Sequence, residues 1–312
     1  MSLIRIEDIS HVRFTAPDLE EMERFLISFG LTPSRDAAGR LLGRGSGGAP
    51  FLHMTEAGEP GFAAIGFRAA SLEDLKILAA AEGVPVEAFD APGGGSVVRL
   101  IDPDGFRVEV VAGQAFEPAF PAGAEAVRNS AAARPRVSSR VRVEAGPSRV
   151  VRLGHAVLEV SDFRTSEAWY KARFGLLTSD EIEGAPGVAI GAFFRCDRGA
   201  TPTDHHTLFL LQGPGGPRFN HAAFEVENLD DLMRGHAHLK ADGRRAAWGV
   251  GRHILGSQVF DYWKDPWGHE LEHWTDGDLF TAADAPGKAG FAELLGVQWG
   301  AVHPMMAQGG RG

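Results

Sequence analysis

The feature that most constrains the fold is a pattern that occurs four times along the chain. Each copy begins with alternating apolar and polar residues, continues with a helical pattern and ends in about three further predicted strands. The segment SLEDL at 71–75 matches NLDDL at 228–232, and DPDGFRVE at 102–109 matches DPWGHELE at 265–272. Two copies therefore make one half of the chain, and the two halves share one plan.

Capping residues mark the ends of several predicted helices. Asp18 precedes the amphipathic segment LEEMERFLISF, and Gly30 follows it. Ser71 and Gly83 bracket the helix of the second copy in the same way, and Asn228 precedes the helix of the fourth. Short polar side chains accept hydrogen bonds from the first free N–H groups of a helix, and glycine adopts the left-handed conformation that ends one.

The repeat predicts an α+β fold of four βαβββ modules in two domains, each a curved mixed β-sheet half-barrel with outer helices. We expect the N-terminal domain at 1–112 and the C-terminal domain at 149–276. Residues 113–148 are rich in Ala, Pro, Ser and Arg and are predicted to be a linker. The tail at 277–312 is rich in Gly and Ala, and we expect it to wrap a surface or an interface.

Composition argues against several classes of protein. The 312 residues carry a net charge of −10, whereas a nucleic acid or an anionic membrane would require a basic face. No segment approaches the roughly 20 apolar residues that span a bilayer, and the N-terminus lacks the pattern of a signal peptide. Cys196 is the single cysteine, which excludes an internal disulfide and fits the reducing cytoplasm.

Three side chains in the second half could bind a metal ion together. In the predicted strand 150–160, His155 alternates with apolar residues and faces the concave side of the sheet. The same parity turns His221 inward and places Glu272 opposite Leu271. Each histidine alone is more often a core or surface residue than a ligand. Together, two histidines and one carboxylate form the set of non-haem Fe(II) oxygenases, which leaves metal positions open for substrate and O2.

The first half provides an internal comparison for this set. His11 and Glu109 occupy the positions of the first histidine and of the carboxylate. The position of the second histidine holds Phe62 or Ala64, depending on a small gap. The first half is therefore predicted to lack a complete metal site. Because Glu109 matches Glu272, Glu272 is favoured as the metal ligand over its neighbour Glu270.

The C-terminal half resembles the type I extradiol dioxygenases of the vicinal oxygen chelate superfamily. The matching stretches are LGHAVLEV, DHHTLFLL, NHAAFEV and GRHILGSQVFDYWKDPWGHELE. The closing signature of that family is represented here by Gly251, His253, Tyr262, Pro266, Gly268 and Glu272. One departure is Asp261, where the family usually has an apolar residue. An incomplete N-terminal half is also a trait of this family, so the resemblance covers nearly the whole chain.

The resemblance implies a role for each residue of the site. The three ligands would bind Fe(II), and sites of this kind also accept Mn(II). His206 would exchange protons with the substrate and O2, while His253 and Tyr262 would bind the substrate oxygens and assist catalysis. His205 is a further candidate for substrate binding, with a solvated loop histidine as the alternative. The expected reaction cleaves a small aromatic diol with O2 to a muconic-semialdehyde-type product, in a cytoplasmic enzyme that forms homo-oligomers.

Two other functions compete with this one. Glutathione-linked transferases or isomerases of the same superfamily use a similar set of ligands, but they lack the accompanying His206, His253 and Tyr262. Metal-free small-molecule binding proteins of this fold lose the metal ligands, whereas this chain keeps all three. Metal content is the simplest observation that separates an enzyme from a binding protein.

Overall fold

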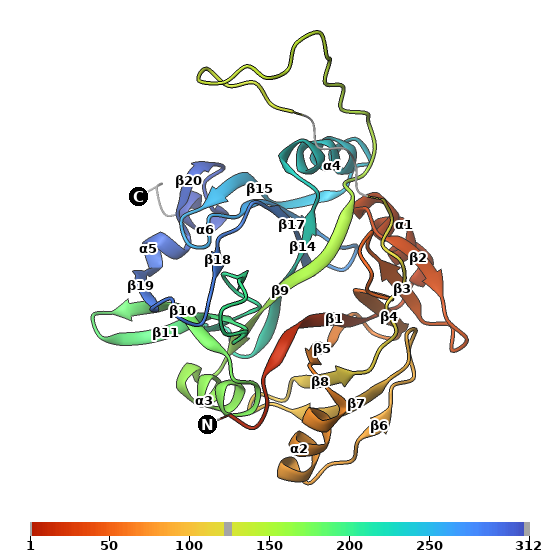
Figure 1. Cartoon of the computed structure of the whole chain (residues 1–312), viewed down its shortest axis with the longest axis vertical. Coiled ribbons are helices and arrows are strands. Elements are labelled where there is room, and N and C mark those ends of the chain that lie inside the picture. Colours follow the sequence, from red (N-terminus) through yellow and green to blue (C-terminus); the bar gives the residue numbers. More distant parts are fainter. Residues whose placement is uncertain (1, 122–126, 309–312) are drawn as a thin grey trace.

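The computed structural model describes residues 2–121 and 127–308, which form two large open β-sheets (Figure 1). The first sheet has eight strands in the order β2-β3-β4-β1-β5-β8-β7-β6. Its strands are β1 (Ile6–Ala16), β2 (Thr32–Arg35), β3 (Leu41–Arg44), β4 (His53–Ala57), β5 (Gly61–Ala69), β6 (Glu87–Ala88), β7 (Ser96–Ile101) and β8 (Arg107–Ala112). The sheet is mixed, because β1 runs parallel to β4 and antiparallel to β5.

The second sheet repeats this order and extends it by one strand at each edge. Its order is β19-β10-β11-β13-β9-β14-β17-β16-β15-β20. The strands of the repeated part are β9 (Val150–Val160), β10 (Leu177–Ala185), β11 (Val188–Arg195), β13 (Leu208–Gln212), β14 (Arg218–Val226), β15 (Arg245–His253), β16 (Val259–Lys264) and β17 (Glu270–Thr275). The two sheets confirm the predicted α+β fold of four βαβββ modules.

One helix follows the first strand of each module. These helices are α1 (Leu19–Phe29), α2 (Leu72–Glu82), α3 (Phe163–Phe174) and α4 (Leu229–Ala241), and Figure 1 shows α2, α3 and α4 at the outside of the molecule. The predicted caps are present: Asp18, Ser71 and Asn228 accept hydrogen bonds from backbone N–H groups of the first turn. Gly30 and Gly83 have positive φ angles of 97° and 68°, which a residue with a side chain rarely adopts.

The two halves share a continuous core. Apolar residues of both sheets belong to one buried cluster. Buried hydrogen bonds also cross between the halves: the Tyr170 hydroxyl donates to Asp102 at 3.0 Å, and His273 Nε2 donates to the Phe29 carbonyl at 2.7 Å. The imidazole of His273 stacks on the ring of Phe29. The first half is therefore packed against the sheet that carries the site.

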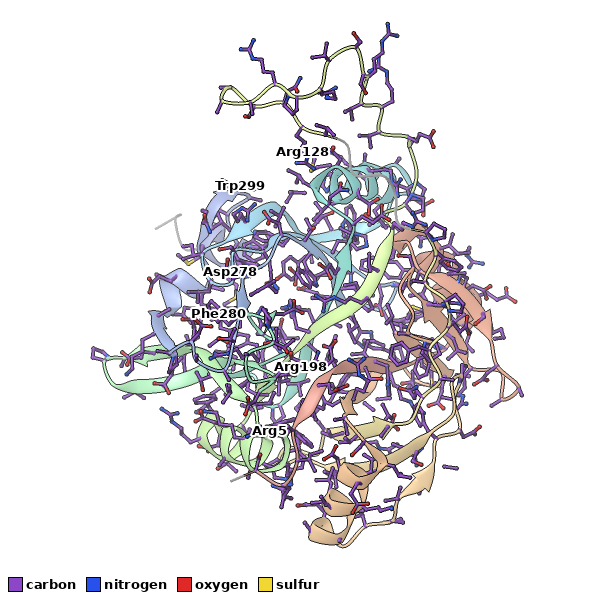
Figure 2. All side chains as sticks on the ribbon, viewed as in Figure 1. Arg5, Arg128, Arg198, Asp278, Phe280 and Trp299 are labelled. Atoms are coloured by element: carbon purple, nitrogen blue, oxygen red, sulfur yellow. The ribbon has the colours of Figure 1, made fainter. Side chains whose placement is uncertain are left out.

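The tail adds structure to the second sheet at several places. It contains β18 (Leu279–Phe280), β19 (Gly287–Gly290), α5 (Phe291–Leu294), β20 (Val297–Gly300) and α6 (Pro304–Gln308). β19 pairs with β10 at one edge of the sheet, and β20 pairs with β15 at the other. β18 pairs with the short strand β12 (Thr203–Asp204). Figure 2 labels Asp278, Phe280 and Trp299 on this segment.

The segment between the two sheets has little regular structure. Residues 113–121 and 127–149 contain neither helix nor strand, and the yellow-green part of this segment loops away from the body at the top of Figure 1. Among the residues that the structure describes, no helix is long and apolar enough to cross a membrane.

Candidate metal centre

Strand register aligns the candidate site residues across the middle of the second sheet. His155 on β9 pairs with Ala223 on β14, and Ala223 pairs in turn with Glu272 on β17. Glu272 is the register partner of Tyr262 on β16. His221 lies two residues before Ala223, so its side chain is on the same face of the sheet. Four neighbouring strands therefore supply one cluster of polar side chains.

The structure brings His155, His221 and Glu272 together. One ligand atom from each lies within 4.8 Å of the other two, and no other such group occurs within residues 2–121 and 127–308. Nε2 of each histidine is 3.3 Å from Glu272 Oε2. These contacts lack hydrogen-bond geometry, and among the described residues Glu272 Oε1, Glu272 Oε2 and His221 Nε2 have no hydrogen-bond partner. Buried polar atoms are normally satisfied, so this donor set is suited to bind a cation.

Hydrogen bonds hold His221 in the orientation that a ligand requires. Asn220 Nδ2 donates to Glu159 Oε1 at 2.9 Å, which turns the amide oxygen toward the neighbouring imidazole. His221 Nδ1 lies 2.8 Å from that oxygen, and only its N–H can donate there. Arg218 also donates to Glu159 at 2.7 Å. This contact at Nδ1 directs Nε2 of His221 into the site, as outer partners of metal-binding histidines commonly arrange.

The electrostatics of the cluster suit a cation. Burial by itself raises the pKa of Glu272, but the adjacent His155 and His221 imidazoles outweigh it and hold that pKa far below its usual range. Burial lowers the pKa of His155. Glu272 is thus an anion and His155 a neutral ring, which are the protonation states that ligate metals.

His206 and His205 form a second group of histidines beside the three candidate ligands. The ring of His206 packs on His155 with centroids 3.9 Å apart. His206 Nδ1 is 3.0 Å from His205 Nδ1, and His205 Nε2 is 2.6 Å from Asp180 Oδ2. Burial, followed by the neighbouring His155, lowers the pKa of His206 well below its usual value. The neutral His206 ring therefore lies between the metal-binding cluster and a carboxylate-anchored histidine.

Tyr262 and His253 approach the cluster from β16 and β15. His253 Nε2 is 3.0 Å from the Tyr262 hydroxyl and 3.8 Å from Glu272 Oε1. Burial, with the charge of Glu272, raises the pKa of Tyr262 well above its usual value, so the phenol stays protonated. Burial lowers the pKa of His253 to about 4, so the imidazole is neutral near pH 7. Both groups can hydrogen-bond a ligand at the cluster.

A cavity of about 450 Å³ opens beside these groups. Its lining includes His155, His221, His206, His253 and Tyr262. Trp248 on β15 and residues of the tail also line the cavity, and no sequence pattern indicates them.

The structure corrects the expectation that His205 binds substrate. His205 is 1% exposed and does not line the cavity, because His206 lies between it and the metal-binding cluster. Its two ring nitrogens are occupied by His206 and Asp180. It is also not a solvated loop residue, so its place in the site is behind His206.

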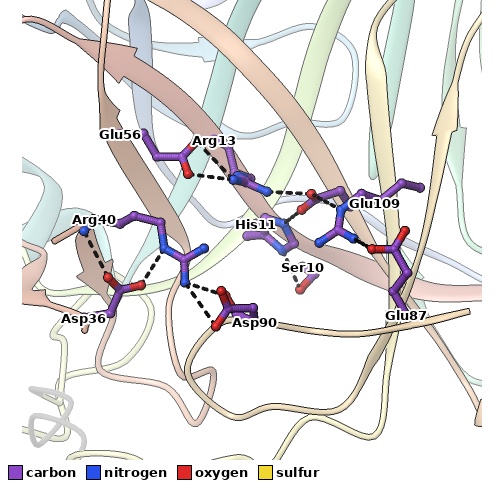
Figure 3. Close-up of polar contacts among 10 residues, drawn as sticks. Ser10, His11, Arg13, Asp36, Arg40, Glu56, Glu87, Asp90 and Glu109 are labelled. Carbon is purple, nitrogen blue, oxygen red and sulfur yellow. Dashed lines mark hydrogen bonds and ion pairs between the residues drawn. The ribbon is translucent and has the colours of Figure 1, made fainter. Parts of the chain in front are cut away.

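The first half contains an ion-pair cluster at the corresponding place (Figure 3). His11 pairs with Gly66 in the register, so Ala64 is the counterpart of His221, and the alternative Phe62 is excluded. His11 Nε2 is 2.9 Å from Glu109, and Arg13 donates to the same carboxylate at 2.6 Å. In the first half, the Arg13 guanidinium thus neutralises Glu109. In the second half, Glu272 has no hydrogen-bond partner among the described residues, and His221 is a third potential ligand.

Comparison with known proteins finds a family match in the second half of the chain. Residues 152–273 match the model of the Glyoxalase/Bleomycin resistance protein/Dioxygenase superfamily. The matched segment makes up most of the second half of the chain. The match spans the strands that carry all three candidate metal ligands.

The similarity to individual proteins covers nearly the whole chain. The chain is 29% identical over 302 residues to Metapyrocatechase 2 of Cupriavidus necator, covering 96% of this chain and 90% of that protein. The Mn(II)-bound glyoxalase from Novosphingobium aromaticivorans has a TM-score of 0.78 at 24% identity, covering 96% and 93% of the two chains. The 2,3-dioxygenase LapB from Pseudomonas sp. KL28 has a TM-score of 0.73 at 17% identity, covering 93% and 99%. These solved structures share the two-sheet fold.

Proposed function

We propose that this protein is an extradiol dioxygenase that cleaves a catechol-type ring with O2 beside its two hydroxyl groups. The observation that carries this proposal is the cluster of His155, His221 and Glu272, whose two histidines line a cavity together with His206, His253 and Tyr262. The likeness to a protein named Metapyrocatechase 2 supports the same reaction class.

The candidate ligands fit Fe(II), and they would also accept Mn(II). Two neutral imidazoles and one carboxylate are the set that non-haem iron oxygenases use. Glu272 contributes one negative charge, so the bound ion would keep a net positive charge that attracts a deprotonated diol. When bound, the metal would supply Lewis-acid chemistry that acidifies the diol and holds it beside O2.

Tyr262 and His253 are suited to hold the oxygens of the substrate. The buried, protonated phenol of Tyr262 can donate a hydrogen bond, and the neutral His253 can accept or donate one. Their mutual contact of 3.0 Å fixes both side chains before the substrate arrives. Such preorganisation lowers the entropic cost of placing the diol.

His206 is suited to move a proton at the face of the cavity where its ring packs on His155. Its contact with His205 leaves Nε2 as the ring nitrogen that can exchange a proton with the substrate. Ring opening requires a proton to leave one oxygen and to be returned to another atom, and an imidazole nitrogen can both accept and donate a proton. The expected product is of the muconic-semialdehyde type.

The proposal is tested by loading the protein with Fe(II) without oxygen, adding substituted catechols and then admitting air. Consumption of O2 together with a coloured ring-opened product is expected, and His155→Ala should abolish both. If the metal is present and catechols neither bind nor consume O2, the proposal fails. A conversion that depends on glutathione would then favour a transferase or isomerase.

A further inference from the structure

The cavity is larger than a single diol ring requires. Its volume of about 450 Å³ lies in the range of sites that enclose drug-sized ligands, roughly 300–1,000 Å³. The metal-binding cluster occupies one part of the lining, and residues of the tail form another. A catechol held at the cluster would therefore leave part of the cavity for a substituent on its ring.

The wall next to the metal-binding cluster is apolar. Val157 is the register partner of His221 on one side and of Phe209 on the other. Phe209 stacks on Phe193 with ring centroids 4.0 Å apart, and Phe193 lies 4.7 Å from the ring of His206. These side chains form an apolar surface that begins at the ligands.

Residues of the tail complete this apolar surface. Leu294 on α5 packs against the cluster that contains Val157, Phe193 and Phe209, and it lines the cavity. Phe291 and Leu295 line the cavity from the same segment. We call Val157, Phe193, Phe209 and Leu294 the apolar wall.

The cations around the cavity are already paired. Arg218 donates to Glu159 at 2.7 Å, and Lys264 lies 3.0 Å from Glu270. Burial lowers the pKa of His303, so this tail imidazole adds no positive charge near pH 7. Among the described residues that line the cavity, no lysine or arginine is therefore left to neutralise an anionic substituent.

We propose that the substrate is a catechol with an uncharged apolar substituent, alkyl or aryl, which binds against the apolar wall. This inference rests on the proposed ring-cleavage function and names the class of its substrate. The tail selects the substituent through Leu294, because it contributes this side of the cavity. A terminal carboxylate would lose its hydration there without gaining a cation.

The test measures binding separately from turnover. Isothermal titration calorimetry on the metal-loaded protein without oxygen would compare catechol, 3-propylcatechol and 4-propylcatechol with the matching dihydroxyphenylpropanoates, in which a carboxylate replaces the terminal methyl. Burial of methylene groups favours binding by about threefold to fourfold each. At least one propylcatechol should therefore bind about 30-fold tighter than catechol, and its carboxylate partner should bind more weakly.

A charge placed on the wall should reverse this preference. In Leu294→Arg, the propanoate of that pair is expected to gain affinity and the propylcatechol to lose it. The matched control Leu279→Arg places the same charge at an exposed tail residue that does not line the cavity, and it should leave both affinities unchanged.

The outcomes separate this inference from the function on which it rests. A propanoate that binds the wild-type protein as tightly as its propylcatechol partner overturns the inference, while ring cleavage stands. Catechol itself tests the function: if neither catechol nor any substituted catechol binds, the proposed ring cleavage fails together with the substrate class.

Discussion

His205 and His206 contact each other through their Nδ1 atoms, which lie 3.0 Å apart. Asp180 fixes the other side of His205, because its carboxylate accepts a hydrogen bond from Nε2 at 2.6 Å. In its neutral form, His205 then offers the Nδ1 lone pair to the N–H at Nδ1 of His206. This arrangement leaves no hydrogen on Nε2 of His206, so this nitrogen can act as a base at the cavity. Asp180 and His205 are therefore positioning residues for His206.

Replacing Asp180 by Asn should weaken catalysis without a large effect on substrate affinity. The amide can donate to His205 as well as accept, so the hydrogen-bond chain no longer fixes the tautomer of His206. Because a placed acid–base group contributes about 100-fold or more, losing its orientation is expected to lower kcat by roughly tenfold. KM should change little. Steady-state O2 uptake measures both constants.

The tautomer itself provides a readout that does not depend on activity. Nitrogen NMR of the metal-free protein distinguishes a hydrogen on Nδ1 from one on Nε2, and Asp180→Asn should shift His206 from the first form toward a mixture. The matched variant Glu181→Gln alters a neighbouring carboxylate that pairs with Arg164, and it should change neither kcat nor the tautomer. An unchanged tautomer in Asp180→Asn would show that Asp180 does not orient His206.

Glu272→Gln should remove the stabilisation that a divalent metal gives to the fold. A ligand at 100 times its Kd stabilises the native state by about 2.7 kcal/mol, and this gain should appear in wild type on adding Mn(II). The matched variant Glu270→Gln changes the next carboxylate along the same face of β17 and should keep the gain. Thermal unfolding with and without metal measures the effect. The same gain in Glu272→Gln would refute the assigned carboxylate ligand.

The two tyrosines should show opposite effects when each is replaced by Phe. Tyr170→Phe leaves Asp102 Oδ2 without its buried donor and should cost about 1–2 kcal/mol of unfolding free energy, with little effect on turnover. Tyr262→Phe removes a hydroxyl from the cavity and should lower turnover with little loss of stability. Urea denaturation and O2 uptake, measured on both variants, check this. Equal losses of turnover would contradict the separation.

Acid should destabilise the protein through Glu109. Burial raises the pKa of this carboxyl, but His11, Arg13 and Arg99 outweigh it and lower the pKa from 4.5 to about 2. Because the folded pKa lies below the unfolded one, the stabilisation is fully present above pH 4.5 and is lost as pH falls toward 2. The loss is about 3 kcal/mol.

The pH effect is measured by denaturant unfolding at a series of pH values. Glu109→Gln should show a smaller decrease in unfolding free energy between pH 4.5 and 2 than wild type. Glu87→Gln, whose carboxylate pairs with Arg99 nearer the surface, should keep the wild-type slope. Identical slopes for wild type and Glu109→Gln would exclude Glu109 as the source.

The fold was predictable because the same pattern of strands and helices is repeated along the chain. The matched segments 71–75 and 228–232 identified equivalent helices, and the alternation around His155 identified the face that lines the site. The choice of Glu272 over Glu270 also depended on a counterpart, Glu109, in the other half. A prediction drawn from repeats is limited to positions that occur in both copies.

The parts that were missed depend on contacts between segments that are distant in sequence. Asp180 on β10 contacts His205 in the connection between β12 and β13, 25 residues away in the sequence, and no local pattern indicates this. Trp248 lines the cavity from β15 near the edge of the sheet, and Leu294 lines it from the tail. The tail has no counterpart in the first half. Arg13 reaches Glu109 through the length of its side chain, which strand parity does not predict.

The most direct test of the central claim is the fate of oxygen in the product. The Fe(II)-loaded protein would convert a propylcatechol under ¹⁸O2, and mass spectrometry would count the labelled atoms in the ring-opened product. Extradiol cleavage predicts that both atoms of O2 enter one product molecule, and that Glu272→Gln forms none. An unlabelled product, or no product from a protein that holds its metal and binds the diol, would contradict the claim.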